Sequence, residues 1–422
     1  MSMPESTDTS EDRNSIPTAG SAHSGESAPP SRTDSSDFQT GYVATFTFAH
    51  AIHDTYSAFL APLLPTLITN LSLSMTQAGA LDFARTILAI LQPLIGHLGD
   101  RVNLRYLIIL APAMTGTMMS LLGVAPNYAA LILLALAAGL GSAFLHALAP
   151  AVSGRFSGAK LGWGMGVWMA GGSIGFAIGP VIIVAVLDRL SLGATPWLMI
   201  GGWIASAILF VRLRDVSTLS PAAHHRGSLR EGFGALKPLM LPLVAIIGVS
   251  ALQISARMTF LPIFLTGQGE SLWFAGIALT VQTGVGWVGA MMGGAISDRW
   301  GRRLVVFVSM SSAAILMLVF LFVGGWVRLP LLALMGITGP ATRTVLMALV
   351  QENCPDNRAM ANGMFLAISF VVESGAAVVM GALGDVFGLE RAFLLSAFIL
   401  LLGSPVVRLL PGRAPSRAEP SR

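Results

Sequence analysis

"GGAISDRWGRR", residues 293–303, repeats in altered form an earlier stretch, "GHLGDRVNLRY", at residues 96–106. Each copy places glycine, an aliphatic residue, the pair Asp-Arg and further basic residues directly after a long apolar segment. The two aspartates, Asp100 and Asp298, lie 198 residues apart, which is close to half of the chain between its polar ends. A repeat at that distance predicts two halves that are built on the same plan.

The composition of the chain is too apolar for a soluble domain. Of its 422 residues, 54% are hydrophobic and 11% are charged, and the mean hydropathy is +0.73. A soluble domain carries about 25% charged residues, so this chain has too few to cover a surface that faces water. Long apolar runs recur along almost its whole length, which predicts an all-α polytopic membrane protein. Cys354 is the only cysteine, which excludes an intrachain disulfide and a cysteine-based metal cluster.

Twelve apolar segments are each long enough to cross a bilayer as a helix, which takes about 20 residues. We expect the first six to form a bundle over residues 40–213 and the last six to form a second bundle over residues 239–410. The predicted spans are 42–67, 76–98, 105–124, 128–150, 162–187, 195–213, 239–266, 272–296, 304–326, 329–350, 360–383 and 390–410.

The remaining parts of the chain are polar. Residues 1–39 are rich in Ser, Pro, Thr and acidic residues, and they contain too few large apolar residues to offset the entropy lost on ordering. They also lack the apolar core of a signal peptide. We therefore expect a disordered tail at 1–39, a central loop at 214–238 and a second tail at 411–422.

The distribution of Lys and Arg predicts the orientation in the membrane. The even-numbered loops contain thirteen basic residues and the odd-numbered loops contain three, and basic loops stay in the cytoplasm. This asymmetry predicts a multi-pass protein of the cell (inner) membrane with both tails and the central loop in the cytoplasm. It also explains the pI near 9.7 without nucleic acid, because the basic residues lie between apolar runs and not in one patch.

The repeated stretch resembles the loop signature of the major facilitator superfamily. The second copy is the closer match, whereas Asn103 and Leu104 replace a glycine and an arginine in the first. The resemblance implies a network that latches one face of the protein and releases it as the two halves rock. The residues that this resemblance assigns to the conformational switch are Gly96, Asp100, Arg101, Gly294, Asp298, Arg299, Gly301, Arg302 and Arg303.

A glycine pattern in the fifth span resembles the signature of drug antiporters within that superfamily. Small residues allow helices to approach closely, and a proline distorts a helix. The final two glycines of the signature are replaced by aliphatic residues here. The pattern favours export over import, and it consists of Gly166, Gly175, Gly179 and Pro180.

Four further pieces resemble the fosmidomycin-resistance-type exporters, a proton-coupled group within the superfamily. They are "HAIHD" in the first span, "GSAFLH" in the fourth, "AGGSIGFAIGP" in the fifth and "VQENCPDNRAMANGM" at residues 350–364. His146 falls where that group has a histidine followed by Pro-Glu. Ala147 and Leu148 follow it here, so the carboxylate of that group is missing.

Ionisable residues inside the predicted spans are the first candidates for function, because placing them in a membrane is costly. His50, His53 and Asp54 share one face of a helix. A carboxylate in a medium of low dielectric can exchange protons within a physiological gradient. We therefore predict that Asp54, His53, His50 and Glu373 are candidates for proton coupling. His50 could instead only hydrogen-bond a neighbouring helix, and Glu373 could be a conformational latch.

Two other readings concern charged pairs and metal. Asp82 and Arg85 are three residues apart, which favours a structural ion pair on one helix face. His50, His53 and Asp54, with His146 as a further ligand, could in principle bind zinc, which needs three or four converging ligands. No cysteine lies nearby and no second His pair is present, so we expect no metal.

Arg257 and Arg343 are expected to line a central cavity. Arginine stays charged at any relevant pH, so each needs a water-filled cavity or an anionic partner, which could be Asp54, Glu373 or a substrate. The offset of 198 residues maps His146 to within one residue of Arg343 and Asp54 to a position beside Gln253. The predicted cavity residues are His146, Arg257, Arg343, Gln253 and Tyr56.

These observations together predict a secondary active transporter that works by alternating access. We expect proton-coupled efflux of a small organic molecule, which could be anionic or drug-like, by a protein that is functional as a monomer in the lipid bilayer. The alternatives are a proton-coupled importer of an organic acid or sugar, and a membrane receptor that does not transport. The sequence contains no nucleotide-binding loop and no serine elbow, so we expect neither an enzyme nor a cofactor.

Overall fold

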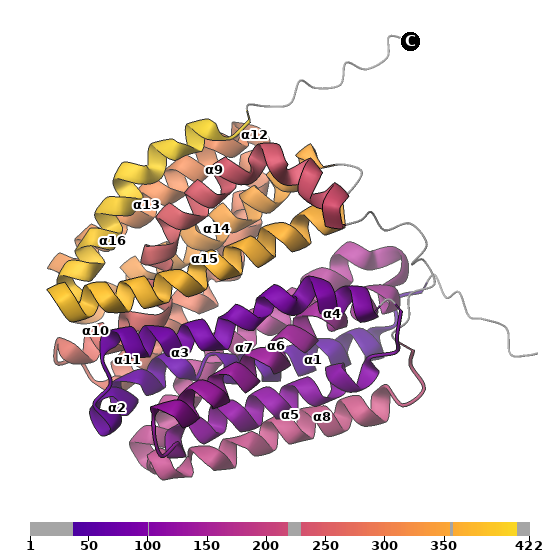
Figure 1. The fold of residues 1–422 in the computed structure, drawn as a ribbon, viewed down its shortest axis with the longest axis horizontal. Helices are drawn as coiled ribbons and strands as arrows, with labels where there is room; N and C mark the ends of the chain where they lie inside the picture. The colour runs from indigo at the N-terminus through magenta and orange to yellow at the C-terminus, as the bar shows by residue number, and fades with distance from the viewer. Residues whose placement is uncertain (1–36, 100, 218–228, 355–357, 412–422) are drawn as a thin grey trace, which may run out of the picture. The chain divides into compact units, whose positions relative to one another are not determined.

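The computed structural model describes residues 37–99, 101–217, 229–354 and 358–411. All regular secondary structure of these residues is helical (Figure 1). The helices of the first half run from indigo to magenta in the figure. They are α1 (Thr40–Ser57), α2 (Leu60–Leu71), α3 (Met75–Ile87), η1 (Leu88–Leu91), α4 (Gln92–Gly99), α5 (Arg105–Leu121), η2 (Leu122–Val124), α6 (Tyr128–Phe156), η3 (Gly158–Lys160), α7 (Leu161–Arg189), η4 (Leu192–Leu198) and α8 (Met199–Arg212).

The second half continues the same plan. Its helices are α9 (Leu229–Ser255), the π-helical turn η6 (Ala256–Phe260), α10 (Leu261–Gly267), α11 (Leu272–Gly284), α12 (Gly286–Trp300), α13 (Arg302–Phe322), η7 (Gly325–Val327), α14 (Arg328–Asn353), α15 (Arg358–Phe387), α16 (Leu389–Gly403) and η9 (Ser404–Leu409).

Each of the twelve predicted spans coincides with one or more of these helices. Eleven helical stretches are long and apolar enough to cross a membrane. The first predicted span, 42–67, is absent from that set because it is divided between α1 and α2 and carries polar residues. The predicted all-α, two-repeat architecture is therefore confirmed.

The ends of the chain and the central loop are only partly described. Residues 1–36 and 412–422, which make up most of the two predicted tails, lie outside the described residues, as do 218–228. Helix α9 begins at Leu229, inside the predicted loop 214–238. The prediction followed hydropathy, whereas a helix can continue beyond the apolar segment that crosses the bilayer.

Two prolines explain interruptions at matching places in the two halves. Pro62 cannot donate a hydrogen bond to the carbonyl of Ala58, and the helix is interrupted at Ala58–Phe59 between α1 and α2. Pro262 likewise cannot donate to Met258, and there the helix widens into the π-helical turn η6. The π-helical turn contains one of the predicted cavity residues.

Glycines on α7 allow this helix to lie directly on α1. A Cβ atom at Gly175 would lie 2.0 Å from the backbone oxygen of Ala51, and one at Gly179 would lie 2.4 Å from that of Thr55. These positions are four residues apart and share a helix face. A Cβ atom at Gly166 would have no atom within 4 Å, so this glycine brings no helix close in the structure, and its predicted packing role stays a prediction. Helix α7 also continues through Pro180 without a break.

Helix α3 of the first half packs on α15 of the second half in the same way. A Cβ atom at Gly79 would lie 2.1 Å from the backbone oxygen of Ala377. At the start of α3, the carboxylate of Asp385 accepts hydrogen bonds from the backbone N–H groups of Met75 at 2.7 Å and Thr76 at 2.9 Å. This contact joins the halves at the end of α3 that lies away from the 96–106 stretch.

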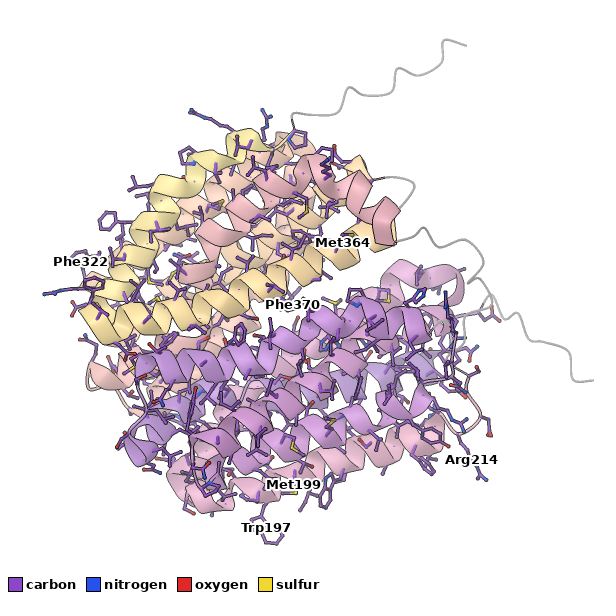
Figure 2. The ribbon with its side chains drawn as sticks, viewed as in Figure 1. Trp197, Met199, Arg214, Phe322, Met364 and Phe370 are labelled. Atoms are coloured by element: carbon purple, nitrogen blue, oxygen red, sulfur yellow. The ribbon has the colours of Figure 1, made fainter. Side chains whose placement is uncertain are left out.

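The outer surface of the helices is apolar, as a bilayer requires. Large apolar side chains project outward, among them Phe322 and Trp197, which are 84% and 75% exposed (Figure 2). Buried polar side chains include two histidines and Arg257. The polar groups inside the helical bundles are therefore the places to look for function.

Candidate functional site

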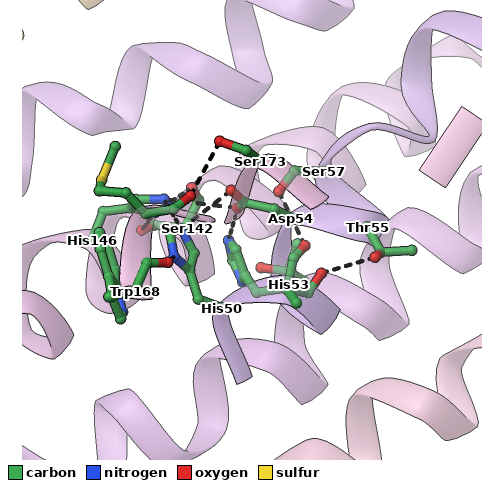
Figure 3. A network of polar contacts seen from close by, with 12 residues as sticks. His50, His53, Asp54, Thr55, Ser57, Ser142, His146, Trp168 and Ser173 are labelled. Atoms are coloured by element: carbon green, nitrogen blue, oxygen red, sulfur yellow. Dashed lines mark hydrogen bonds and ion pairs between the residues drawn. The ribbon is translucent and has the colours of Figure 1, made fainter. Parts of the chain in front are cut away.

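A polar centre lies between α1, α6 and α7 and consists of His50, Asp54 and His146 (Figure 3). We call it the His–Asp centre. Nε2 of His50 lies 3.2 Å from Oδ2 of Asp54, one helical turn further along α1. His146, on α6, places its Nε2 3.3 Å from Nε2 of His50 and 3.7 Å from Oδ1 of Asp54. The structure thus brings together two predicted coupling residues and one residue that was predicted to line the substrate cavity.

The other nitrogen of each imidazole has a partner that fixes where its proton lies. Nδ1 of His50 is 2.9 Å from the backbone oxygen of Trp168, and Nδ1 of His146 is 3.0 Å from that of Ser142. A carbonyl oxygen only accepts hydrogen bonds, so we assign the proton of each neutral imidazole to Nδ1. The hydroxyl of Ser142, 3.3 Å from Nδ1 of His146, is then a second acceptor for the same N–H group. In neutral imidazoles both Nε2 atoms are then acceptors, and they face an ionised carboxylate that also only accepts. One additional proton would supply the donor that these three groups lack.

The geometry of the His–Asp centre is also compatible with a bound metal ion. One ligand atom from each of His50, Asp54 and His146 lies within 4.8 Å of the other two. Structural zinc sites take four protein ligands, and the described part of the chain adds no fourth ligand to this group. The expectation that the protein holds no metal stays a prediction.

Helix α7 covers the His–Asp centre with Trp168, a large side chain, and with Gly172, which has no side chain. The indole ring of Trp168 stacks on the imidazole of His50 with ring centroids 3.8 Å apart, a contact that favours a positively charged imidazole. A Cβ atom at Gly172 would lie 2.5 Å from Nε2 of His50 and 2.8 Å from Oδ2 of Asp54. The sequence did not single out Gly172, because glycines are frequent in membrane helices.

His53 lies beside this centre and does not pair closely with it. Its side chain is fully buried, and neither ring nitrogen has a hydrogen-bond partner among the described residues. Nε2 of His53 is 3.9 Å from Oδ1 of Asp54, which is longer than the contact made by His50. The carboxylate therefore interacts first with His50 and only weakly with the histidine next to it in sequence.

A second polar site is a cavity inside the second half, between α9, η6, α13, α14, α15 and α16. We call it the arginine cavity. The space between its lining residues, counted together with the part that is open to solvent, is about 520 Å³. Gln253, Arg257, Arg343 and Glu373 are among the residues that line it. Three of these four were predicted to line a substrate cavity. Glu373 was predicted to take part in proton coupling, and it lies here instead of beside Asp54.

The two arginines of this cavity differ in their partners. Nη2 of Arg343 lies 2.5 Å and 2.6 Å from the two carboxylate oxygens of Glu373, so this pair is a closed ion pair. Arg257 is 2% exposed and makes one hydrogen bond, from Nη1 to the backbone oxygen of Met335 at 3.3 Å. Its Nε atom has no partner, and no ion pair to it is found among the described residues. Gln253 donates to the backbone oxygen of Ala313 at 2.7 Å.

The predicted pair Asp82–Arg85 is present and also connects the two halves. Nη2 of Arg85 lies 2.6 Å from Oδ1 of Asp82, and the hydroxyl of Thr259 on η6 donates to Oδ2 of Asp82 at 2.7 Å. One turn further along α3, the hydroxyls of Thr86 and Ser374 lie 2.5 Å apart. The structural interpretation of this pair is therefore supported, and its contact with the second half is new.

The second loop repeat forms an ion-pair network at the junction of α12, α13 and α14. Nη2 of Arg302 lies 2.7 Å from Oδ1 of Asp298 and 2.6 Å from Oε1 of Glu352. Gly301 has φ of +91°, which only glycine adopts readily. Arg303 donates to the backbone oxygen of Leu410.

The first loop repeat is described in part. Asp100 lies outside the described residues. Gly96 lies next to α6, because a Cβ atom at this position would be 3.8 Å from the backbone oxygen of Ala147. Arg101 is exposed. Gly294 and Arg299 lie on α12. The predicted switching role of both loops stays a prediction. Glu352 lies within the quoted piece at residues 350–364, but its contact with Arg302 was missed because the two residues are 50 positions apart and meet only through the packing of α13 on α14.

Tyr56 does not line the arginine cavity. It is 5% exposed, and its hydroxyl accepts a hydrogen bond from the backbone N–H of Gly202 at 2.9 Å and donates to the backbone oxygen of Leu198. This side chain therefore fastens α1 to η4 and α8. The prediction that it lines a substrate cavity rested on residue type, and packing accounts for the residue in the structure.

Comparisons with known proteins agree with this architecture. The model of the Major Facilitator Superfamily matches residues 46–371 and 243–422, so the chain belongs to that superfamily and is a multi-pass membrane protein of a transporter family. It is 26% identical over 366 residues to the MFS-type transporter YfnC of Bacillus subtilis (strain 168), a match that covers 84% of this chain and 89% of the relative.

Two further similarities extend over most of the chain. The fosmidomycin resistance protein of Escherichia coli (strain K12) is 23% identical over 387 residues, which is 88% of this chain and 93% of that protein. A crystal structure of a bacterial homolog of the human lysosomal transporter Spinster superposes with a TM-score of 0.76 at 15% identity, covering 88% of this chain and 98% of that one. The structural likeness confirms the predicted major facilitator fold.

Proposed function

We propose that this superfamily transporter couples the movement of protons to the export of a small organic molecule by alternating access. The observation that carries the proposal is the His–Asp centre, in which two imidazole acceptors and a carboxylate face one another. With one added proton the three groups attract, and without it they repel. Proton binding would therefore change the relative stability of the conformations that hold α1, α6 and α7 together.

The proton would lie between Nε2 of His50 and Oδ2 of Asp54, which are 3.2 Å apart. His146 would stabilise the charged form from the other side, and Trp168 would do so through its stacked ring. Asp54 is the residue that cannot be replaced, because it is the only carboxylate in the centre. Glu373, held by Arg343, is assigned to the second half and not to the coupling proton.

Export is favoured by two features. The Escherichia coli relative is named as a resistance protein. Helix α7 also carries the glycines that resemble the antiporter signature. In the proposed topology the basic loops, both tails and the central loop face the cytoplasm, and residues 40–213 and 239–410 move as two bundles. The repeated plan of two six-span halves fits a monomer as the working unit.

The first test replaces Asp54 with asparagine, which has nearly the same shape and cannot carry the proton. In proteoliposomes with an imposed pH gradient, a panel of organic acids, amines and neutral drugs is screened while internal pH is recorded. We expect the wild type to show proton movement that depends on one of these compounds, and Asp54→Asn to show none. Asp188→Asn, an exposed position at the end of α7, is the matched control and keeps normal proton movement.

Three results would contradict parts of the proposal. Normal proton coupling in Asp54→Asn removes the role of the His–Asp centre. Proton movement in the same direction as the compound identifies an importer. The absence of flux for every compound, in a protein that is folded and binds ligands, identifies a receptor.

A further inference from the structure

The arginine cavity contains a buried cation that forms no ion pair with any residue in the described part of the chain. Arg257 is 2% exposed, and its Nε atom has no hydrogen-bond partner among the described residues. A guanidinium group stays protonated in proteins, so it cannot escape the cost of burial by losing its charge. A buried and unpaired charge costs several kcal/mol, and a fold keeps one only where something compensates for it.

The nearest carboxylate in the cavity cannot compensate for it, because that carboxylate is already in use. Both oxygens of Glu373 lie within 2.6 Å of Nη2 of Arg343. Two arginines and one glutamate therefore give the lining of the cavity one net positive charge. One negative charge from a ligand would balance it.

The rest of the lining indicates what kind of ligand would carry that charge. Apolar side chains make up much of the wall, and Ile246, Met310 and Phe365 are among them. Ser250 also lines the cavity, and its hydroxyl is buried without a partner among the described residues. A molecule that fits this wall has one acidic group for the arginine and the hydroxyl, and an apolar body.

We propose that the arginine cavity is the binding site for an amphiphilic organic anion, with Arg257 as the residue that selects for the negative charge. The inference rests on the proposed function in one respect, namely that this anion is the exported molecule. The π-helical turn at Ala256–Phe260 sets the position of Arg257 in the wall, since widening the helix changes which side chains face the cavity. The Arg343–Glu373 pair forms another part of the lining.

The first test compares the thermal stability of two variants without any ligand. Arg257→Gln removes an unbalanced charge, so we expect its Tm in detergent to rise by about a few degrees. Arg343→Gln is the matched control, because it leaves Glu373 unpaired and lowers Tm. A fall of Tm in Arg257→Gln that equals the fall in Arg343→Gln would overturn the proposal, since it would mean that Arg257 already has a partner.

The second test measures ligand binding by isothermal titration calorimetry with phenylacetate, cinnamate and octanoate, each against its neutral amide. We expect at least one acid to bind wild type at least tenfold more tightly than its amide. Arg257→Gln abolishes that preference, and Arg257→Lys keeps part of it because the charge remains. Equal binding of acids and amides, no binding of any acid, or an unchanged preference in Arg257→Gln would overturn the proposal.

A lipid headgroup could supply the same negative charge, so the binding test is run in nanodiscs of phosphatidylcholine and repeated with phosphatidylglycerol. Loss of acid binding in the second preparation would assign the site to lipid and overturn the proposal. The variant Asp54→Asn distinguishes a failure of this inference from a failure of the proposed function. If only the proton proposal is wrong, acid binding still depends on Arg257. If only the anion proposal is wrong, proton coupling still depends on Asp54.

Discussion

The two halves place different chemistry at related positions of one repeated plan. In the first half, His50, Asp54 and His146 face one another with acceptor atoms and lack a donor. In the second half, the position related to His146 is within one residue of Arg343, and the lining of the cavity carries an excess of one positive charge. A repeat thus preserves where polar residues lie, while each half acquires its own type of charge. In our proposal the first half handles the proton and the second half binds the anion.

The largest effect is expected from a substitution at Gly172, which should disrupt the His–Asp centre and leave the arginine cavity intact. In Gly172→Leu a side chain would occupy the space of His50 and Asp54, since even a Cβ atom would lie 2.5 Å and 2.8 Å from their polar atoms. We expect transport to fall by about 100-fold or more, which corresponds to about 3 kcal/mol, while acid binding in the second half persists. Flux in proteoliposomes and calorimetry check the two readouts.

Gly166→Leu is the matched control for this prediction. It lies on the same helix, and no atom is found within 4 Å of a Cβ at that position. We expect transport close to that of the wild type. If both leucine variants lose activity equally, the effect at Gly172 comes from α7 as a whole and not from the His–Asp centre.

A smaller effect is expected where α3 meets α15. Asp385→Ala removes the carboxylate that accepts hydrogen bonds from the backbone of Met75 and Thr76. The loss of such a helix N-terminal contact costs about 1 kcal/mol. Because this contact joins the two halves, we expect the start of α3 and the end of α15 to be apart in a larger fraction of the molecules of this variant. Electron-spin distance measurements between labels on the two helices check this, and an unchanged distance distribution would contradict it.

The smallest effect is expected in the loop repeat. Arg302→Ala breaks the ion pairs with Asp298 and Glu352, but the two carboxylates are 64% and 48% exposed, so solvent screens the interaction. Exposed pairs contribute about 1 kcal/mol or less, and chemical denaturation measures the change. A loss of several kcal/mol would show that this loop holds the second half together.

The sequence predicted the fold well because the length and hydropathy of a span depend on local composition alone. It also predicted the pair Asp82–Arg85, since three residues along a helix fix that distance. It failed where a contact depends on how helices pack. The space left by Gly172 and the contact of Asp385 with α3 each join segments that lie far apart in the chain. For Arg343 the sequence named Glu373 as one of three possible partners, and only the packing of α14 on α15 selects it. Gly166 and Tyr56 show the converse, because a motif or residue type predicted roles that the packing in this structure does not show.

The most direct test of the central claim is to separate movement of the ligand from its coupling to protons. Proteoliposomes are loaded with the acid that binds most tightly, and exchange of labelled for unlabelled acid is measured at equal pH on both sides. Accumulation driven by a pH gradient is then measured in the same preparation. We predict that Asp54→Asn keeps exchange and loses accumulation, whereas Arg257→Gln loses both. Accumulation at the wild-type level in Asp54→Asn would contradict the account.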